Sequence, residues 1–156
     1  MEGKRSPKET GISDLTGKVV RIRHATEPEM VFIEEKMKKL KLDTRNLDYR
    51  EFVVATEDGE IVGFGRLKQD CGLSEIGCVV VIDEKRKHGI AAEITRHLVD
   101  YAPVKRVYIF TDSADFFRGM GFKKAKKTKE YFHVFGPKGE REIQKGILLS
   151  YEKADT

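Results

Sequence analysis

The middle of the chain holds the residues whose types and spacing are best suited to chemistry. An apolar stretch, SEIGCVVVI (74–82), is followed by basic residues at 85–87, by Gly89, and by apolar positions at helical spacing from 90 to 102. The first turn of a helix leaves four N–H groups unpaired, and the helix dipole adds about half a positive charge there. Gly89 would let the backbone approach a ligand, and Ala91 would keep the helix close to the sheet. The pattern therefore predicts a phosphate-binding turn between a strand and a helix.

The same pattern also fits an ordinary strand-to-helix turn whose basic residues are simply solvated. Spacing alone leaves both interpretations open. Two named nucleotide sites are excluded, because the sequence has no GxxxxGK[ST] and no GxGxxG after its first apolar strand.

Composition bounds the class of protein. The 156 residues suit a single domain with a sizeable core, and 30 basic against 26 acidic residues give a net charge of +4. No apolar run approaches the ~20 residues of a membrane span, and the amino terminus lacks a signal-peptide core. Cys71 and Cys78 form no CxxC, which argues against a metal site. We expect a soluble, cytoplasmic protein with a flexible leader at 1–17 and one domain at 18–156.

The elements that position the candidate turn follow from hydrophobic periodicity and turn residues. Expected strands cover 19–25, 51–57, 60–69, 74–82, 104–112, 121–135 and 145–153, and expected helices cover 27–40, 89–102 and 113–120. We expect the apolar end of strand 74–82 to be buried on both faces. Asp112 is the expected cap of the short helix, and Gly121 its end. This order predicts an α/β (α+β) fold with a mixed central sheet of about six to seven strands and helices on both faces.

The motif in this region resembles that of a known superfamily. Arg86-Lys87-His88-Gly89-Ile90-Ala91 matches R/Q-x-x-G-x-G/A, the pyrophosphate-binding motif of the GNAT acetyltransferases. VYIFTDSADFFRGMGF (107–122) resembles the later strand and short helix of that family, written A-x-x-FY-x-x-x-GF. The similarity runs from about Val19 to Tyr151, and SEIGCVVV with FTDSADFFRGMGF looks most like the acetylglutamate-synthase-like, amino-acid-acetylating branch.

The resemblance implies acetyl-CoA as cosubstrate and no metal. Backbone groups of 79–81 would pair with the pantetheine arm, and amides of 86–92 would hold the pyrophosphate. The cofactor-binding residues that it implies are Val79, Val80, Val81, Arg86, Lys87, His88, Gly89, Ile90, Ala91, Ala92 and Phe117.

The resemblance also places a general base. Glu75 lies eleven residues before Arg86, where several GNAT enzymes carry a catalytic glutamate, although a solvated strand carboxylate is the alternative. Acetyl transfer needs a neutral amine, and a carboxylate can take the proton directly or through water. Phe117 stands where many members have a tyrosine that protonates the thiolate, so the general acid is unassigned. Ser113, Tyr108 and Tyr131 are the substitutes to consider.

The predicted function is acetyl transfer to a primary amine by direct attack in a ternary complex, with the α-amine of a small amino acid as the best candidate acceptor. A protein N-terminus or a lysine side chain is an alternative acceptor, and a catalytically inactive CoA-binding module is an alternative of another class. We expect a small-molecule or peptide amine as partner, with no membrane or nucleic acid, and leave a homodimer open. Arg45 and Arg50 are candidate readers of an acceptor carboxylate. The lysines of 123–129 are read as a solvated strand face, and Cys78 as a buried structural thiol.

Overall fold

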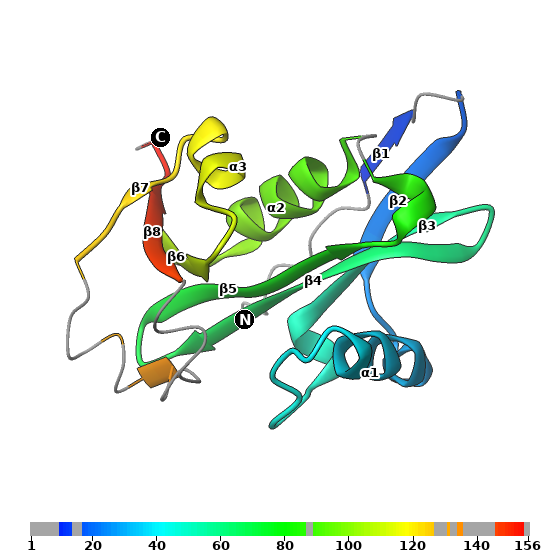
Figure 1. Ribbon diagram of the computed structural model, residues 1–156, viewed down its shortest axis with the longest axis horizontal. Helices are drawn as coiled ribbons and strands as arrows, with labels where there is room; N and C mark the ends of the chain where they lie inside the picture. The colour runs from blue at the N-terminus through cyan, green and yellow to red at the C-terminus, as the bar shows by residue number, and fades with distance from the viewer. Residues whose placement is uncertain are drawn as a thin grey trace, which may run out of the picture. The chain divides into compact units, whose positions relative to one another are not determined.

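The computed structural model describes residues 10–13, 17–86, 89–126, 131, 134–135 and 146–154. Its elements are shown in Figure 1 and follow in the order β1 (Thr10–Ser13), β2 (Val19–His24), η1 (Glu27–Glu29), α1 (Met30–Lys39), η2 (Tyr49–Glu51), β3 (Phe52–Glu57), β4 (Glu60–Asp70), β5 (Leu73–Val81), η3 (Asp83–Lys85), α2 (Ile90–Tyr101), β6 (Arg106–Thr111), α3 (Ala114–Gly119), β7 (Lys123–Lys124) and β8 (Ile147–Glu152). The chain divides into two compact units. The first comprises Met1–Arg66 and Cys78–Tyr101, and the second comprises Leu67–Gly77 and Ala102–Thr156.

The sheet of the first unit is covered by a helix on each face. Strands β1, β2, β3, β4 and β5 are neighbours in that order, and the side chains of β2 to β5 alternate between the two faces. On one face, strand residues pack with the apolar side of α1 in a cluster of Phe52, Val54, Phe64, Cys78, Ile33 and Met37. On the other face, Gly63 and Gly65 of β4 lie against the α2 side chains of Ile94 and Leu98. Figure 1 shows α1 and α2 on opposite sides of these strands, which confirms the prediction of helices on both faces for this unit.

Two glycines of β4 bring neighbouring elements close to the strand. A Cβ atom built at Gly65 would lie 2.6 Å from Cγ2 of Ile94, and one at Gly63 would lie 2.9 Å from the carbonyl oxygen of Val80. Because Cβ atoms do not approach heavy atoms this closely, only glycine fits at either position without a shift of its neighbours. Gly63 and Gly65, on either side of Phe64 in the sequence, thus determine how near α2 lies to the sheet.

Helix α1 is fixed at its start by Glu29. The Glu29 carboxylate accepts the backbone N–H of Thr26 at 2.8 Å and two bonds from Arg23 of β2, at 2.9 and 2.8 Å. The bonds from Arg23, with the backbone bond from Thr26, lower the pKa of Glu29 to about 2. Pro28 lies in the η1 turn, where its missing N–H costs nothing. The predicted helix start is confirmed, with its first turn tightened to a 3-10 turn.

Two predicted two-residue turns are present. Asp58 and Gly59 connect β3 to β4, and Cys71 and Gly72 connect β4 to β5; all four have φ between +49° and +81°. This left-handed conformation at both central positions is that of a type I′ turn, whose twist matches an antiparallel hairpin. The turns fix which residues of β3, β4 and β5 face one another.

The second unit is built on β5, β6, β8 and β7, which are neighbours in that order. The parallel ladder between β5 and β6 pairs Ser74, Glu75 and Ile76 with Val107, Tyr108 and Ile109. Strand β8 runs antiparallel to β6 over its whole length. Helix α3 ends at Gly119, and Gly121 closes it as predicted: its φ is +103° and its N–H bonds to the carbonyl of Arg118 at 2.9 Å.

The structure departs from the sequence prediction at several elements. Strand β1 lies inside the expected leader and pairs with β2. Within the expected strand 121–135, only Lys123 and Lys124 are strand among the described residues, and they form β7, which pairs with β8. Residues 131, 134 and 135 are helical, and 127–130 and 132–133 lie outside the described residues. Ser113 rather than Asp112 is the N-cap of α3, and its side chain makes no capping bond. A short strand at a sheet edge forms because a neighbouring strand pairs with it, and its own sequence pattern contributes little. Hydrophobic periodicity therefore did not predict β1 or the bounds of β7.

No described helix is long and apolar enough to cross a membrane. Within the described ranges, no three His, Cys, Asp or Glu side chains gather in a way that could hold a metal ion.

Candidate active site

The N-terminus of α2 has the geometry of an anion-binding turn. Gly89, the residue just before the helix, has φ of +81°, is exposed, and has open space around a built Cβ. The first bond of the helix runs from Glu93 N–H to the Gly89 carbonyl at 3.2 Å. The amides of 89–92 precede that bond and belong to the turn in which N–H groups have no partner within the helix. Open space, free amides and the positive end of a twelve-residue helix therefore coincide.

The side chains at the start of α2 differ in burial and size. Ile90 is 1% exposed and anchors the turn in the core, while Ala91 and Ala92 are half-buried and small. These three positions thus offer backbone rather than side-chain groups to a ligand. Lys87 and His88, which the sequence analysis also assigned to the cofactor, lie outside the described residues.

The basic residues before the helix are already bonded to the protein. Arg86 pairs with Asp83 at 3.1 Å, and its Nε lies 3.5 Å from the Val81 carbonyl. Lys85 extends back to the carboxylate of Glu57 on β3, with 2.7 Å between Nζ and Oε1. Lys85 therefore does not add an uncompensated charge around the turn, whereas the exposed Arg86 side chain lies at the surface beside it.

The apolar end of β5 is more open than the sequence suggested. Val79, Val80 and Val81 are half-buried, so the expectation of burial on both faces is wrong. In the first unit β5 is the last strand of the sheet, with β4 as its neighbour there. Backbone groups on the free side of an edge strand can accept another extended segment. This is the arrangement that the resemblance implied for 79–81.

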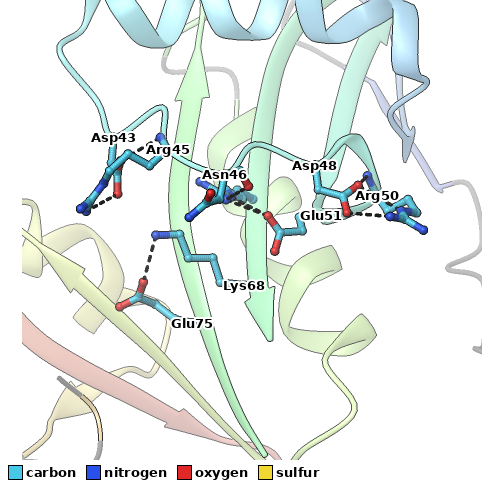
Figure 2. Close-up of polar contacts among 9 residues, drawn as sticks. Asp43, Arg45, Asn46, Asp48, Arg50, Glu51, Lys68 and Glu75 are labelled. Carbon is cyan, nitrogen blue, oxygen red and sulfur yellow. Dashed lines mark hydrogen bonds and ion pairs between the residues drawn. The ribbon is translucent and has the colours of Figure 1, made fainter. Parts of the chain in front are cut away.

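Glu75 is the most deeply buried carboxylate of the second unit among the described residues, at 1% exposure. It faces Lys68 across the Cys71–Gly72 hairpin, with 4.0 Å between Lys68 Nζ and Glu75 Oε1, as Figure 2 shows. The β5–β6 register also sets it beside Tyr108. Glu75 is therefore not a solvated strand carboxylate, and the alternative that the sequence analysis left open is wrong. Sequence analysis missed Lys68, although a two-residue turn at 71–72 pairs position 68 with position 75.

Phe117 lies in an aromatic cluster of α3 and the strands beside it. It is 5% exposed, and its ring contacts Phe116 at 4.9 Å and Phe122 at 5.7 Å between centroids. Phe122 in turn packs on Tyr151 at 5.4 Å. The cluster has no hydroxyl at the position where a tyrosine is usual, so the general acid must come from elsewhere or from solvent.

The three substitutes for that acid have different surroundings. Tyr108 is half-buried beside Glu75, and its ring lies 5.4 Å from that of Tyr131, which is fully buried. The Ser113 hydroxyl lies 3.4 Å from the carboxylate of Asp112. Tyr108 is thus the substitute that the structure sets next to the candidate base.

Arg45 and Arg50 each bond to a carboxylate two residues earlier in the chain. Each places its guanidinium against the carboxylate two residues earlier, Asp43 or Asp48, through two bonds of 2.9–3.1 Å (Figure 2). The bonds that Arg50 donates to Asp48 raise the pKa of Arg50. An arginine that already holds a carboxylate at both ends of its fork is a poor reader of a second one. The repeated Asp-x-Arg spacing was visible in the sequence.

Cys78 is buried in the α1 cluster, which confirms its reading as a structural thiol. On α2, His97 is buried and Tyr101 is half-buried. The Tyr101 ring meets His24 of β2 edge-on at 4.9 Å, and His97 is 7% exposed.

The fold and this turn define a class: an α/β domain that presents a helix N-terminus beside an open strand edge. Residues 48–124 match the family model of the acetyltransferase (GNAT) domain. They form a GNAT-family acetyltransferase domain, and the resemblance seen in the sequence is confirmed. A search of curated proteins gave no significant match.

Solved structures share the fold at low identity. N-acetylglutamate synthase from Neisseria gonorrhoeae, complexed with coenzyme A and N-acetyl-glutamate, is 19% identical with a TM-score of 0.71, over 87% of this chain and 35% of that one. Rv2747 from Mycobacterium tuberculosis, in complex with CoA and NLQ, is 21% identical with a TM-score of 0.71, over 85% and 99%. Arabidopsis thaliana Naa50, with the bisubstrate analogue CoA-Ac-MVNAL, is 15% identical with a TM-score of 0.59, over 85% and 98%. The chain therefore spans about a third of the synthase's length.

Proposed function

We propose that this protein transfers the acetyl group of acetyl-CoA to a primary amine. The observation that carries the proposal is the start of α2 within a GNAT-family domain. There Gly89 is left-handed with open space around a built Cβ, and the amides of 89–92 precede the first hydrogen bond of the helix. A pyrophosphate is the ligand that such a turn suits best, because it brings two phosphate groups to several N–H donors and a helix dipole at once.

In this proposal, different residues of the chain bind different parts of the cofactor. The amides of 86–92 hold the pyrophosphate, with the Arg86 side chain beside it. The family resemblance assigns Lys87 and His88 to the cofactor as well. The backbone of Val79, Val80 and Val81 pairs with the pantetheine arm as an added strand. The end of the β5–β6 ladder at Ile76 supports this, because 79–81 lie beyond it. Phe117 stays an apolar neighbour of the cofactor, on the resemblance alone.

Glu75 is the base that removes a proton from the acceptor amine. Its burial at 1% exposure means that the proton reaches it through a water or after a small opening of the site, not from bulk solvent. The neutral amine then attacks the thioester carbonyl in the ternary complex. In this proposal a backbone N–H of β5 stabilises the oxyanion, a contribution of ~3 kcal/mol in acyl-transfer sites. The thiolate leaves as a stable anion, and Tyr108, water or the product ammonium supplies its proton.

The acceptor class follows from the charge beside the base. The Lys68 ammonium lies 4.0 Å from Glu75, so a cation and an anion stand side by side within the second unit. This pair suits an acceptor whose amine and carboxylate are also side by side, as in the α-amino group of a small amino acid. The synthase that shares this fold was solved with N-acetyl-glutamate, which supports that choice. A protein N-terminus is the alternative acceptor, since the Naa50 structure holds a CoA–peptide analogue. We place the enzyme in the reducing cytoplasm, where its thiols at 71 and 78 stay reduced.

The test is turnover in a Glu75→Gln variant. Wild-type protein is assayed for thiol release from acetyl-CoA with a panel of amino acids, peptide N-termini and lysine peptides. We expect the variant to bind acetyl-CoA with unchanged affinity and to turn over at least ~100-fold more slowly, because a positioned base contributes about that much. Glu60→Gln, an exposed carboxylate at the start of β4, is the matched control. A Glu75→Gln enzyme of wild-type rate would remove Glu75 from the mechanism.

A catalytically inactive CoA-binding module is the second candidate, and Phe117 is the observation that favours it. A ring without a hydroxyl at the usual acid position removes one catalytic group. Acetyl-CoA binding with no thiol release for any amine of the panel would support this candidate. Absence of acetyl-CoA binding would exclude both candidates.

A further inference from the structure

A buried ion pair ties the strand β3 to the segment that leads into α2. The Glu57 carboxylate, at the end of β3, has a side chain only 6% exposed, and the Lys85 side chain is 17% exposed. Their 2.7 Å bond is the shortest contact of Glu57, since Lys18 lies at 3.8 Å from the same oxygen. Oε2 of Glu57 is buried and has no hydrogen-bond partner among the described residues. Lys85 is therefore the main compensation for a buried negative charge.

The pair acts where the chain turns from β5 toward the helix. Ile82 N–H bonds to the Val62 carbonyl of β4 at 2.9 Å, and Lys85 N–H bonds to the Ile82 carbonyl at 3.0 Å. The η3 turn is thus held by a backbone bond at its beginning and by the Glu57–Lys85 bond at its end. Arg86, which follows directly, is extended with φ of −67° and ψ of 154°. Both attachments therefore fix the chain as far as Arg86, three residues before Gly89.

We propose that Glu57 is a positioning residue for the cofactor: through Lys85 it fixes the η3 turn and so the direction in which the first amides of α2 point. This inference rests on the proposed function, because it concerns how the same turn binds CoA. Glu57 itself touches no reacting atom. Its role is to hold a lysine that would otherwise extend into solvent, as long lysine side chains do.

Simple electrostatics predicts the opposite effect of removing Glu57. If the carboxylate were only a negative charge near the phosphates, Glu57→Gln would tighten CoA binding by removing repulsion. The same variant would also tighten binding if Lys85 were a phosphate ligand that Glu57 sequesters. A positioning role instead predicts weaker binding. The sign of the change therefore separates the interpretations.

The experiment measures the Kd of acetyl-CoA by calorimetry for wild type, Glu57→Gln, Lys85→Met and the double variant. Glu34→Gln is the matched control, because it removes one carboxylate from an exposed ion pair with Lys38 on α1. Circular dichroism at the assay temperature verifies that each variant is folded. Should Lys85→Met fail to fold, with its buried carboxylate left unpaired, Glu57→Gln and the double variant still decide the sign.

We expect Glu57→Gln and Lys85→Met each to raise Kd by about 10-fold, and the double variant to raise it no further, since one coupled interaction is lost in all three. Tighter binding by Glu57→Gln, or an unchanged Kd, would overturn the positioning role while leaving the proposed function intact. Additive losses in the double variant would also overturn it, because they would make Lys85 an independent ligand. No binding by wild type would instead contradict the proposed function.

Discussion

Replacement of Gly89 by alanine separates the cost of backbone strain from the cost to cofactor binding. Gly89 has φ of +81° and open space around a built Cβ, so alanine meets no clash there. The left-handed conformation costs an L-residue about 1–2 kcal/mol, and the stiffer unfolded chain returns part of this. We expect the free energy of unfolding to fall by about 1 kcal/mol, which lowers Tm by roughly 2–4 °C for a domain of this size.

The backbone strain in Gly89→Ala should also weaken the binding of acetyl-CoA. If alanine relaxes away from the left-handed conformation, acetyl-CoA binding must restore it, and 1–2 kcal/mol corresponds to about a 5- to 30-fold higher Kd. The added methyl group also occupies space in front of the amides of 89–92. At a concentration 100 times the wild-type Kd, the ligand stabilises wild type by about 2.7 kcal/mol. A tenfold weaker Kd reduces that stabilisation to about 1.4 kcal/mol, so roughly half of the thermal shift is lost.

Gly59 provides the control. It has the same φ of +81° and the same open surroundings, but it lies in the β3–β4 hairpin turn. Thermal unfolding with and without acetyl-CoA is measured for both alanine variants. We expect similar losses of Tm without ligand, and a reduced ligand-induced shift only for Gly89→Ala. Equal shifts in the two variants would refute the assignment of the cofactor phosphates to the start of α2.

A Gly65→Ala substitution would place a Cβ 2.6 Å from a side chain of α2. We expect denaturant titration to show that the free energy of unfolding falls by about 1–3 kcal/mol, and unchanged stability would contradict the close packing of that helix. The pKa of Glu29 is lowered from 4.5 to about 2, chiefly by Arg23, so its contribution is complete above pH ~4.5 and is lost as the pH falls toward 2. We expect wild type to lose about 2 kcal/mol more than Glu29→Gln across that range, and parallel curves would count against the ion pair. Burial, together with nearby His24, lowers the pKa of His97 below 6.5, so stability is present above pH 6.5 and declines as the pH falls below it. His97→Gln should flatten that decline in thermal unfolding between about pH 7 and pH 5, and an equally steep decline would show that His97 does not titrate as inferred.

Some features could be predicted because their causes lie within a few residues. Two-residue turns at 58–59 and 71–72 need only left-handed residues between apolar strands. Proline in the first turn marks the start of the helix after β2. The turn before α2 is equally local, since one glycine and a following apolar periodicity define it. These signals placed the motif on a strand, a loop and a helix before any packing was known.

Other features depend on which segments meet, and sequence periodicity does not report that. Val79 and its neighbours form an apolar run that reads as fully buried, yet they are half-buried because β5 ends the sheet of the first unit. The short strand β1 has no pattern of its own and exists because β2 offers it a partner. Burial and pairing are set by neighbours in space, so they were decided only by the fold.

The sequence by itself indicated the family, the turn before α2 proposed to bind the cofactor and the candidate base, because a helix start and a short motif are encoded by adjacent residues. Tertiary structure decided which charged side chains lie against one another. Lys68 lies against Glu75, and Lys85 lies against Glu57 rather than toward a phosphate. A lysine reads the same in a sequence whether it is solvated, paired or bound to a ligand. Which of these it becomes depends on the carboxylate that folding brings within reach, and on how much water remains around the pair.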